Sequence, residues 1–544
     1  MRYGPDFLVI AAYFIAIVWV GLSFSRKSRT VSQFSIGDRQ IPWWAVLGSI
    51  LAAEISAATF LGAPGEGYGL RNFTYAQLAI GTLLARVIVS YVFIKPYYDY
   101  RVISIYEFLH VRFGVRTKNA ASAVFLFTRI LASGSRLYIA AVVLVLGYEM
   151  LTGAKPTLRQ ELLIYIGSLV LLTLFTTLYT SLGGIKAVVW TDVIQAAVMF
   201  GSLAFAIWML LRHIPGGWHG ALSCLKAPGD LSVFDTGIDA TRSWGANFKY
   251  ILKNEYTLWA AFFASTFITM ATHGTDQDMV QRMLTAKNYH RSRLAVVLSG
   301  LADIPLVMVF LLVGILLWAF YRFHPDPNLP DKNPYIFAYY ILHELPVGVR
   351  GLLIAGIFAT AMGSLSTALN ALATSFIQDW YLPYLNPAAD ETSQVRALRW
   401  STVVFAIALI VVGSLTALVV LTVKDSRIIP IVLGIFAYTY GPLLGVFLVG
   451  MLTRSRGNEA GNLPAMLSGF LAVTFFSGLY CKLPLLFGRA EWTQPHWLPA
   501  ISFPWWITIG TCVTFGIAVL FRTPASQQDL ARRHVASANP PFQS

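Results

Sequence analysis

Apolar residues along this chain gather in runs of about 20 residues that short polar segments separate. A run of that length crosses the hydrocarbon core of a bilayer as an α-helix. The ten-residue alternation of a transmembrane barrel is not found, so the pattern predicts an all-α polytopic membrane protein. About 13 transmembrane helices are expected, at residues 5–23, 41–63, 74–95, 119–148, 161–181, 187–211, 255–274, 294–321, 350–376, 400–423, 428–453, 462–481 and 503–521.

The second run begins as a membrane helix and is not expected to finish as one. It carries a lone carboxylate, Glu54, near the depth of the bilayer midplane, and then Gly62, Pro64, Gly65 and Gly67, where we expect the helix to break. An unpaired backbone carbonyl in hydrocarbon costs several kcal/mol, so protein, water, a substrate or an ion must satisfy it. The stretch therefore indicates a binding site, with a simple kink against a neighbouring helix as the alternative.

Composition supports the membrane assignment and adds an orientation. The 544 residues are 56% hydrophobic and 12% charged, with a mean hydropathy of +0.62, which is too apolar for a soluble protein. The net charge of +14 reflects Lys and Arg in loops, so no nucleic-acid partner is expected. We expect a plasma-membrane protein with its N-terminus outside and its C-terminus cytoplasmic, because this orientation places the basic loops in the cytoplasm. These loops are residues 24–40, 96–118, 275–293, 454–461 and the tail after 521.

Several polar features interrupt the remaining helices. Arg129 and Arg136 lie seven residues apart on one helix face, and we expect them to pair with acids or helix-end carbonyls, with substrate contact as the alternative. Gly183 and Gly184 predict a tight turn at the inner surface, after which Asp192 complements the helix dipole or faces a cation. The segment 102–114 reads as an amphipathic helix along the inner membrane surface.

A stripe of small and hydroxyl residues marks the ninth run. Thr360, Gly363, Ser364 and Thr367 share one helix face, with Ser366 alongside. Such a stripe permits close helix packing or supplies several oxygens to an alkali cation. His273, at the end of the seventh run, is either a hydrogen-bonded interface residue or a ligand.

The domain organisation follows from these runs. Residues 1–523 form one transmembrane domain, and residues 524–544, rich in Pro, Ser, Gln and Ala, are expected to be a disordered cytoplasmic tail. Two five-helix sets, about 41–211 and 255–453, each begin with a run interrupted by polar residues. They are possible halves of an inverted repeat.

Five segments, taken together and in order, resemble the sodium/solute symporter family, which contains sodium–glucose, sodium–proline and sialic acid symporters. The resemblance covers about residues 5–453 and implies a LeuT-like fold of five-plus-five inverted repeats with flanking helices, and alternating access driven by sodium. The segments are Gly37-Asp-Arg with the broken helix to Gly65, Ile105-Tyr-Glu-Phe-Leu with Arg112-Phe-Gly, Gly183-Gly-Ile-Lys-Ala with Trp190-Thr-Asp, Thr275-Asp-Gln with Val280-Gln-Arg, and the Ser/Thr stripe ending in Asp379-Trp-Tyr.

The resemblance implies a main sodium site at the backbone oxygens of Ala52, Ile55 and Thr360 and at residues Gly363 and Ser364. Gly363 departs from the family pattern because it lacks the expected hydroxyl, so that water or Glu54 must complete the shell, or the site is weaker. A possible second sodium would use Asp192, Ser366 and Thr367.

The solute site implied by the resemblance lies between the broken helix, the end of the seventh run and the eleventh run. The family's sugar-contacting residues are mostly replaced here, by Glu54, Thr59, Ala302 or Asp303, and Gly434, so a hexose is not implied. The residues expected to contact solute are Glu54, Ser56, Thr59, Thr272, His273, Gly434 and Tyr438.

We therefore expect a sodium-coupled symporter of a small organic solute, embedded in the lipid bilayer. One alternative is proton coupling on the same fold, with Glu54 as the carrier. Another is a non-transporting sensor, although the segment after Pro524 is too short for a signalling domain. The sequence shows no paired-acid cluster, HExxH motif or nucleophile elbow, so an enzyme is not expected. Solute identity and oligomeric state are left open.

Overall fold

The computed structural model describes residues 3–24, 29–422, 428–482, 492–495 and 497–538, and within these ranges the chain is helical without a strand. Among these residues, seven helices are long and apolar enough to cross a membrane, and the bent pair α3–α4 makes an eighth candidate span. The long elements are α1 (Gly4–Ser23), α5 (Leu78–Val92) continued by α6 (Ile94–Asp99), α8 (Val115–Thr152), α9 (Leu158–His213), α14 (Tyr289–Phe323), α16 (Val349–Phe376) continued by a π-helical stretch (Ile377–Leu385), and α17 (Glu391–Thr422).

The other predicted apolar runs also fall on helices. They correspond to a π-helical turn (Ala260–Ser265) with α12 (Thr266–Gly274), and to α18 (Ile428–Leu452), α19 (Glu459–Phe476) and α21 (Pro504–Ala518). Outside the runs lie α10 (Gly217–Cys224), α11 (Trp244–Lys253) and α15 (Asn333–His343), while α20 (Leu479–Lys482) begins at the end of the run 462–481. The predicted all-helical membrane class is therefore confirmed.

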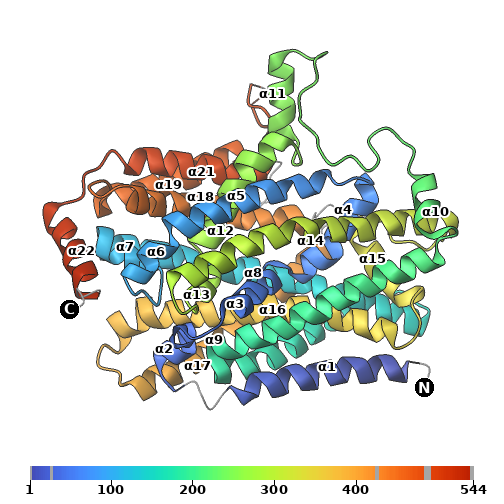
Figure 1. Cartoon of the computed structure of the whole chain (residues 1–544), viewed down its shortest axis with the longest axis horizontal. Helices are drawn as coiled ribbons and strands as arrows, with labels where there is room; N and C mark the ends of the chain where they lie inside the picture. Colours follow the sequence, from blue (N-terminus) through green and yellow to red (C-terminus); the bar gives the residue numbers. More distant parts are fainter. Residues whose placement is uncertain (1–2, 25–28, 423–427, 483–491, 496, 539–544) are drawn as a thin grey trace.

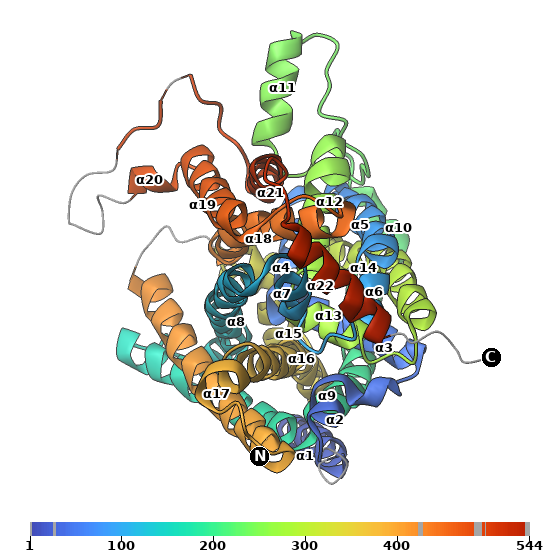
Figure 2. The ribbon, with the colours of Figure 1, turned by 90° about the vertical axis from the view of Figure 1, so that its left-hand side faces the viewer.

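The long helices run roughly side by side, with the N-terminus at one end of the bundle and α22 (Ala525–Ala538) at the other (Figure 1). Helices α18, α19 and α21 gather along one side, and α1, α9 and α17 along the opposite side (Figures 1 and 2). Helix α16 lies between them and is the most enclosed, since 89% of its apolar window is buried. The small residues of α16 allow that close packing.

Helix α9 contains the predicted glycine turn. Its 56 residues would measure about 84 Å if straight, far more than one membrane crossing needs. Gly184 breaks it with φ 58° and ψ −155°, a conformation that residues with a Cβ rarely adopt. Tyr165 before the break packs on Tyr138 near α15, and Ser202 after it bonds the first turn of α16, so the chain folds back on itself.

The break in the second run lies earlier than we predicted. Helix α3 (Trp43–Glu54) ends before Ile55, and α4 (Ala57–Leu70) departs from it at 66°. The expected break at the glycine-rich stretch is wrong, because α4 continues through it. A side chain on Gly65 would overlap Pro334 of α15, and one on Gly67 would overlap Leu311 of α14. These glycines serve close helix packing.

One end of the bundle carries short helices, among them α2 (Val31–Ile36), α7 (Tyr106–Phe113), α13 (Gln277–Met283) and α22 (Figure 1). The segment expected to be an amphipathic helix contains α7, whose bounds are shorter. The tail was expected to be disordered, and this is wrong for residues 525–538, which form α22. Its helix docks on α7, because the Gln527 amide donates to the carbonyls of His110 and Val111, two of the last carbonyls of α7. Residues 539–544 lie outside the described part of the chain.

Candidate functional site

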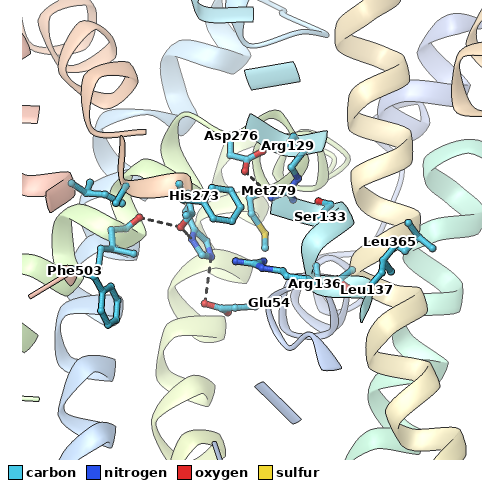
Figure 3. Close-up of a pocket in the computed structure, with 17 residues that line it drawn as sticks. Glu54, Arg129, Ser133, Arg136, Leu137, His273, Asp276, Met279, Leu365 and Phe503 are labelled. Atoms are coloured by element: carbon cyan, nitrogen blue, oxygen red, sulfur yellow. Dashed lines mark hydrogen bonds and ion pairs between the residues drawn. The ribbon is translucent and has the colours of Figure 1, made fainter. Parts of the chain in front are cut away.

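A cavity of about 170 Å³ lies beside the α3–α4 break, between α3, α8, α12, α16, α18 and α21 (Figure 3). Its wall combines charged and apolar side chains. The lining residues are Ala53, Glu54, Arg129, Ser133, Arg136, Leu137, Ile268, Thr272, His273, Asp276, Met279, Ser364, Leu365, Phe436, Ala437, Phe503 and Ile507.

The α3–α4 break places the C-terminal end of α3 at this cavity and the N-terminal end of α4 just beyond it in the chain. Ile55 and Ser56 have extended backbones, with ψ of 99° and 170°, so the last carbonyls of α3 lack intrahelical partners. The C-terminal end of α3 carries the negative end of its dipole, and the N-terminal end of α4 carries a positive one. Such a junction can bind a cation on one side and an anionic group on the other.

Glu54, the last residue of α3, is held by an arginine that sequence reasoning missed. Arg86 of α5 forms an ion pair with Glu54 and donates a further hydrogen bond to Ser299 Oγ at 2.8 Å. The Arg86 side chain is fully buried, whereas that of Glu54 is 25% exposed. The sequence contained a signal for this ion pair, since a lone arginine inside an apolar run needs a partner.

His273 lies on the other side of Glu54. Its Nε2 is 3.9 Å from Glu54 Oε1, and its Nδ1 lies 3.1 Å from the Thr272 hydroxyl. Thr272 and His273 both line the cavity with Glu54 (Figure 3). The structure therefore brings together three of the residues that were expected to contact solute.

The two arginines of α8 differ in their partners. Arg129 forms an ion pair with Asp276 at 3.1 Å and a second one with Asp278, which confirms the prediction that it pairs with acids. Arg136 lies over the ring of Phe436 at 4.8 Å and projects toward the cavity (Figure 3). Within the described part of the chain Arg136 has no ion pair.

The residues expected to bind the main sodium lie at the α3–α4 break and on α16. A methyl group on Gly363 would lie 3.4 Å from the Ala52 carbonyl oxygen, so these two elements face each other there. The Thr360 and Ser364 hydroxyls donate to carbonyls three residues back in α16, at 2.8 and 3.1 Å. Ser364 also lines the cavity, and Ile55 sits at the break itself.

Asp192, expected either to complement a helix dipole or to face a cation, faces an arginine. Its Oδ2 accepts from Ser49 Oγ at 2.6 Å and from Arg282 Nη2 at 3.4 Å. Arg282 also pairs with Asp278 at 2.6 Å, and the Thr367 hydroxyl reaches the same Asp278 at 3.4 Å. Ser366 donates to the Gly363 carbonyl at 3.0 Å. A second sodium at Asp192, Ser366 and Thr367 stays a prediction.

Three of the described residues that were expected to contact solute are not among those that line the cavity. Ser56 caps the N-terminal end of α4 and Thr59 lies in its first turn, and neither is among the residues of the wall. The Tyr438 hydroxyl donates to Ser477 of α19 at 3.1 Å, away from the break. Gly434 belongs to residues 428–435 of α18, whose side-chain surroundings are outside the described structure.

Comparison with known proteins gives consistent matches over most of the chain. A model of the sodium:solute symporter family matches residues 34–469. The sodium/sialic acid symporter SiaT of Proteus mirabilis is 26% identical over 86% of this chain and 88% of its own length. The sodium-dependent multivitamin transporter of Oryctolagus cuniculus is 28% identical over 96% of this chain and 78% of its own length. The bovine sodium-coupled monocarboxylate transporter 2 is 28% identical over 86% of this chain and 71% of its own length.

Two solved structures share the fold. A sodium-coupled sialic acid symporter, in a substrate-bound outward-open state, superposes with a TM-score of 0.76 at 23% identity, over 95% of this chain and 97% of that one. A nucleobase-cation-symport-1 family transporter in a closed conformation superposes with a TM-score of 0.51 at 13% identity, over 94% and 96%. These likenesses confirm the predicted LeuT-like fold, while the inverted-repeat boundaries stay a prediction.

Proposed function

The chain belongs to the sodium:solute symporter family, as a sodium-coupled symporter of a small solute, and we propose that its solute is a small organic acid whose carboxylate binds Arg136. The observation that carries this proposal is the contrast among the buried arginines. Arg86, Arg129 and Arg282 each pair with a carboxylate, whereas Arg136 faces the cavity without one. A desolvated guanidinium is costly unless an anion compensates it.

A carboxylate suits the guanidinium because the two groups form paired, charge-assisted hydrogen bonds. The apolar part of the lining suits an organic group, since Leu137, Ile268, Met279 and Phe436 line the same cavity. The positive N-terminal end of α4 adds to the preference for an anion. Among the relatives, one transports sialic acid and another monocarboxylates, by their names, which supports the same solute class.

Sodium binding at the α3–α4 break is the second part of the proposal. The ligands would be the oxygens of Ala52, Ile55 and Thr360 with Ser364, beside Gly363. Sodium would stabilise the outward-open state, the organic acid would complete the site, and movement of the repeats would release both inside. We place the N-terminus outside and the C-terminus in the cytoplasm of a plasma-membrane protein; the basic loops and the position of the termini at opposite ends of the bundle (Figure 1) support this.

The test is uptake of radiolabelled solutes into proteoliposomes under an imposed sodium gradient, comparing short organic acids with neutral sugars and zwitterionic amino acids. We expect organic acids alone to accumulate. Arg136→Gln should abolish their accumulation, while Arg136→Lys, which keeps the charge but not the paired geometry, should raise KM. Arg242→Gln, on an exposed arginine outside the cavity, is the control. Accumulation of a neutral solute that Arg136→Gln leaves unchanged would overturn the proposal.

A further inference from the structure

Three oxygen atoms from two helices, α3 and α9, converge beside Gly363 of α16. A methyl group built on Gly363 would lie 3.0 Å from Gln195 Oε1, 3.4 Å from the Ala52 carbonyl oxygen and 3.7 Å from Asp192 Oδ1. Ala52 belongs to the last turn of α3, and Asp192 and Gln195 lie one turn apart on the second half of α9. The glycine of α16 thus leaves room at a point that oxygens surround.

The two side-chain oxygens at this point, Asp192 Oδ1 and Gln195 Oε1, are buried and accept no hydrogen bond of normal geometry from the described residues. Gln195 is 2% exposed and Asp192 is fully buried. Among the described residues, Asp192 Oδ1 and both amide atoms of Gln195 have no hydrogen-bond partner of normal geometry, although the Tyr13 and Tyr179 hydroxyls lie near the amide. Buried polar atoms are normally paired, so an unsatisfied set of this kind indicates a ligand that completes it.

The chemistry of the set fits a small hard cation. The donors are a backbone carbonyl, an amide oxygen and a carboxylate oxygen, and oxygen donors of these types suit hard cations. The other carboxylate oxygen of Asp192 is already occupied by Ser49 and Arg282, which leaves Oδ1 directed at Gly363. The carbonyl end of the α3 dipole adds further negative potential.

We propose that Gln195 supplies to bound sodium the side-chain oxygen that Gly363 lacks. An amide oxygen reaching from α9 would then occupy the position of a hydroxyl on residue 363 of α16. The inference rests on the sodium site of the proposed function and is independent of which organic solute is carried. It predicts that residues 195 and 363 are coupled, because either can provide the same ligand.

The experiment measures sodium binding to the purified protein without organic solute, as the sodium-dependent rise in its thermal unfolding temperature, with choline as the control cation. Gln195→Met keeps the length of the side chain and removes both polar atoms, and should weaken apparent sodium affinity roughly 10- to 100-fold. Gln195→Ala should weaken it similarly, and adding Gly363→Ser to Gln195→Ala should restore most of the loss. Gly363→Ser alone should bring no gain, since the new Cβ would crowd Gln195 Oε1 at 3.0 Å. Gln528→Met, in α22, is the matched control.

Unchanged sodium affinity in folded Gln195→Met would overturn the inference and leave water as the occupant of this space. Failure of Gly363→Ser to rescue Gln195→Ala would also overturn it, because the two positions would not then supply one ligand. If Gln195→Met does not fold, the substitute variant is Gln195→Asn, whose side chain is shorter by one methylene and withdraws the oxygen. This variant must show the same loss of apparent sodium affinity for the inference to stand. If the wild-type protein carries no organic acid yet shows this pattern of sodium binding, the proposed solute is wrong and the inference stands.

Discussion

Arg86 of α5 and Glu54 of α3 form an ion pair directly at the break between α3 and α4. Since Arg86 also donates a hydrogen bond to Ser299 of α14, the pair ties α5 and α14 to the last residue of α3. Removing one partner of a buried pair leaves an uncompensated charge, which costs far more than removing both. Glu54 therefore holds the broken helix in place as well as facing the cavity.

We expect Glu54→Gln to alter ion coupling, because it keeps the shape of the side chain and deletes its charge. Under sodium coupling the variant should lose apparent sodium affinity in uptake assays, since the break and Ile55 adjoin it. Under proton coupling it should instead lose pH-driven accumulation and retain solute exchange. Arg86→Gln alone should destabilise the folded state by about 3–5 kcal/mol. The double variant that carries both Glu54→Gln and Arg86→Gln should be destabilised by less than Arg86→Gln alone. Wild-type sodium and pH dependence in Glu54→Gln would contradict both mechanisms.

We expect Ser364→Ala to lower apparent sodium affinity more than it lowers expression. Gly363 has no hydroxyl, so Ser364 is the adjacent α16 side chain left to offer an oxygen at the break. The measurement is the sodium dependence of uptake at fixed solute. Thr402→Ala is the matched control, because its buried hydroxyl also donates within its own helix, to Leu398 at 2.9 Å. A shift of the same size in both variants would remove Ser364 from the sodium site.

We expect Gly67→Ala to destabilise the protein, since the added methyl would overlap the Leu311 backbone of α14. Overpacking of this kind costs about 1–3 kcal/mol. Gly201→Ala in α9 should be neutral or stabilising, because no atom lies within 4 Å of the added methyl and alanine favours helix. Thermal unfolding of both variants in one detergent provides the comparison. Equal transitions would show that α4 and α14 can separate at Gly67 without cost.

We expect stability near neutral pH to depend on Glu107 of α7. Burial, with the nearby charge of Asp379, raises the pKa of Glu107 to about 7. Because this lies above the unfolded value of about 4.3, the folded state binds the proton more tightly, and the contribution is lost as pH rises toward 7. Glu107→Gln should unfold at a higher temperature than wild type at pH ~8 and at about the same temperature at pH ~4. A constant difference across this pH range would exclude titration of Glu107 as the cause.

The sequence predicted the helices, the glycine turn in α9 and the need of Arg129 for acids or helix-end carbonyls as partners, because hydropathy and the cost of a lone buried charge are local signals. The sequence misplaced the break in the second run, because Ile55 and Ser56, where the helix breaks, have no unusual helix propensity. Gly65 and Gly67 have a low helix propensity, but they serve helix packing instead. Arg86 and Glu54 lie 32 residues apart, and such pairing depends on tertiary structure. The α22 helix likewise depends on its contacts with α7, which composition does not reveal.

The turn at Gly184 limits where the protein can be labelled. The two halves of α9 meet there without a loop, and a methyl group on Gly183 would lie 3.0 Å from the Gly21 carbonyl oxygen of α1, so an inserted epitope would disrupt the packing of this turn. The segment 225–243 is largely exposed and lacks a helix, so it should accept an insertion. An epitope in that segment, and another after α22, would show from antibody access on intact cells which end of the bundle faces outward.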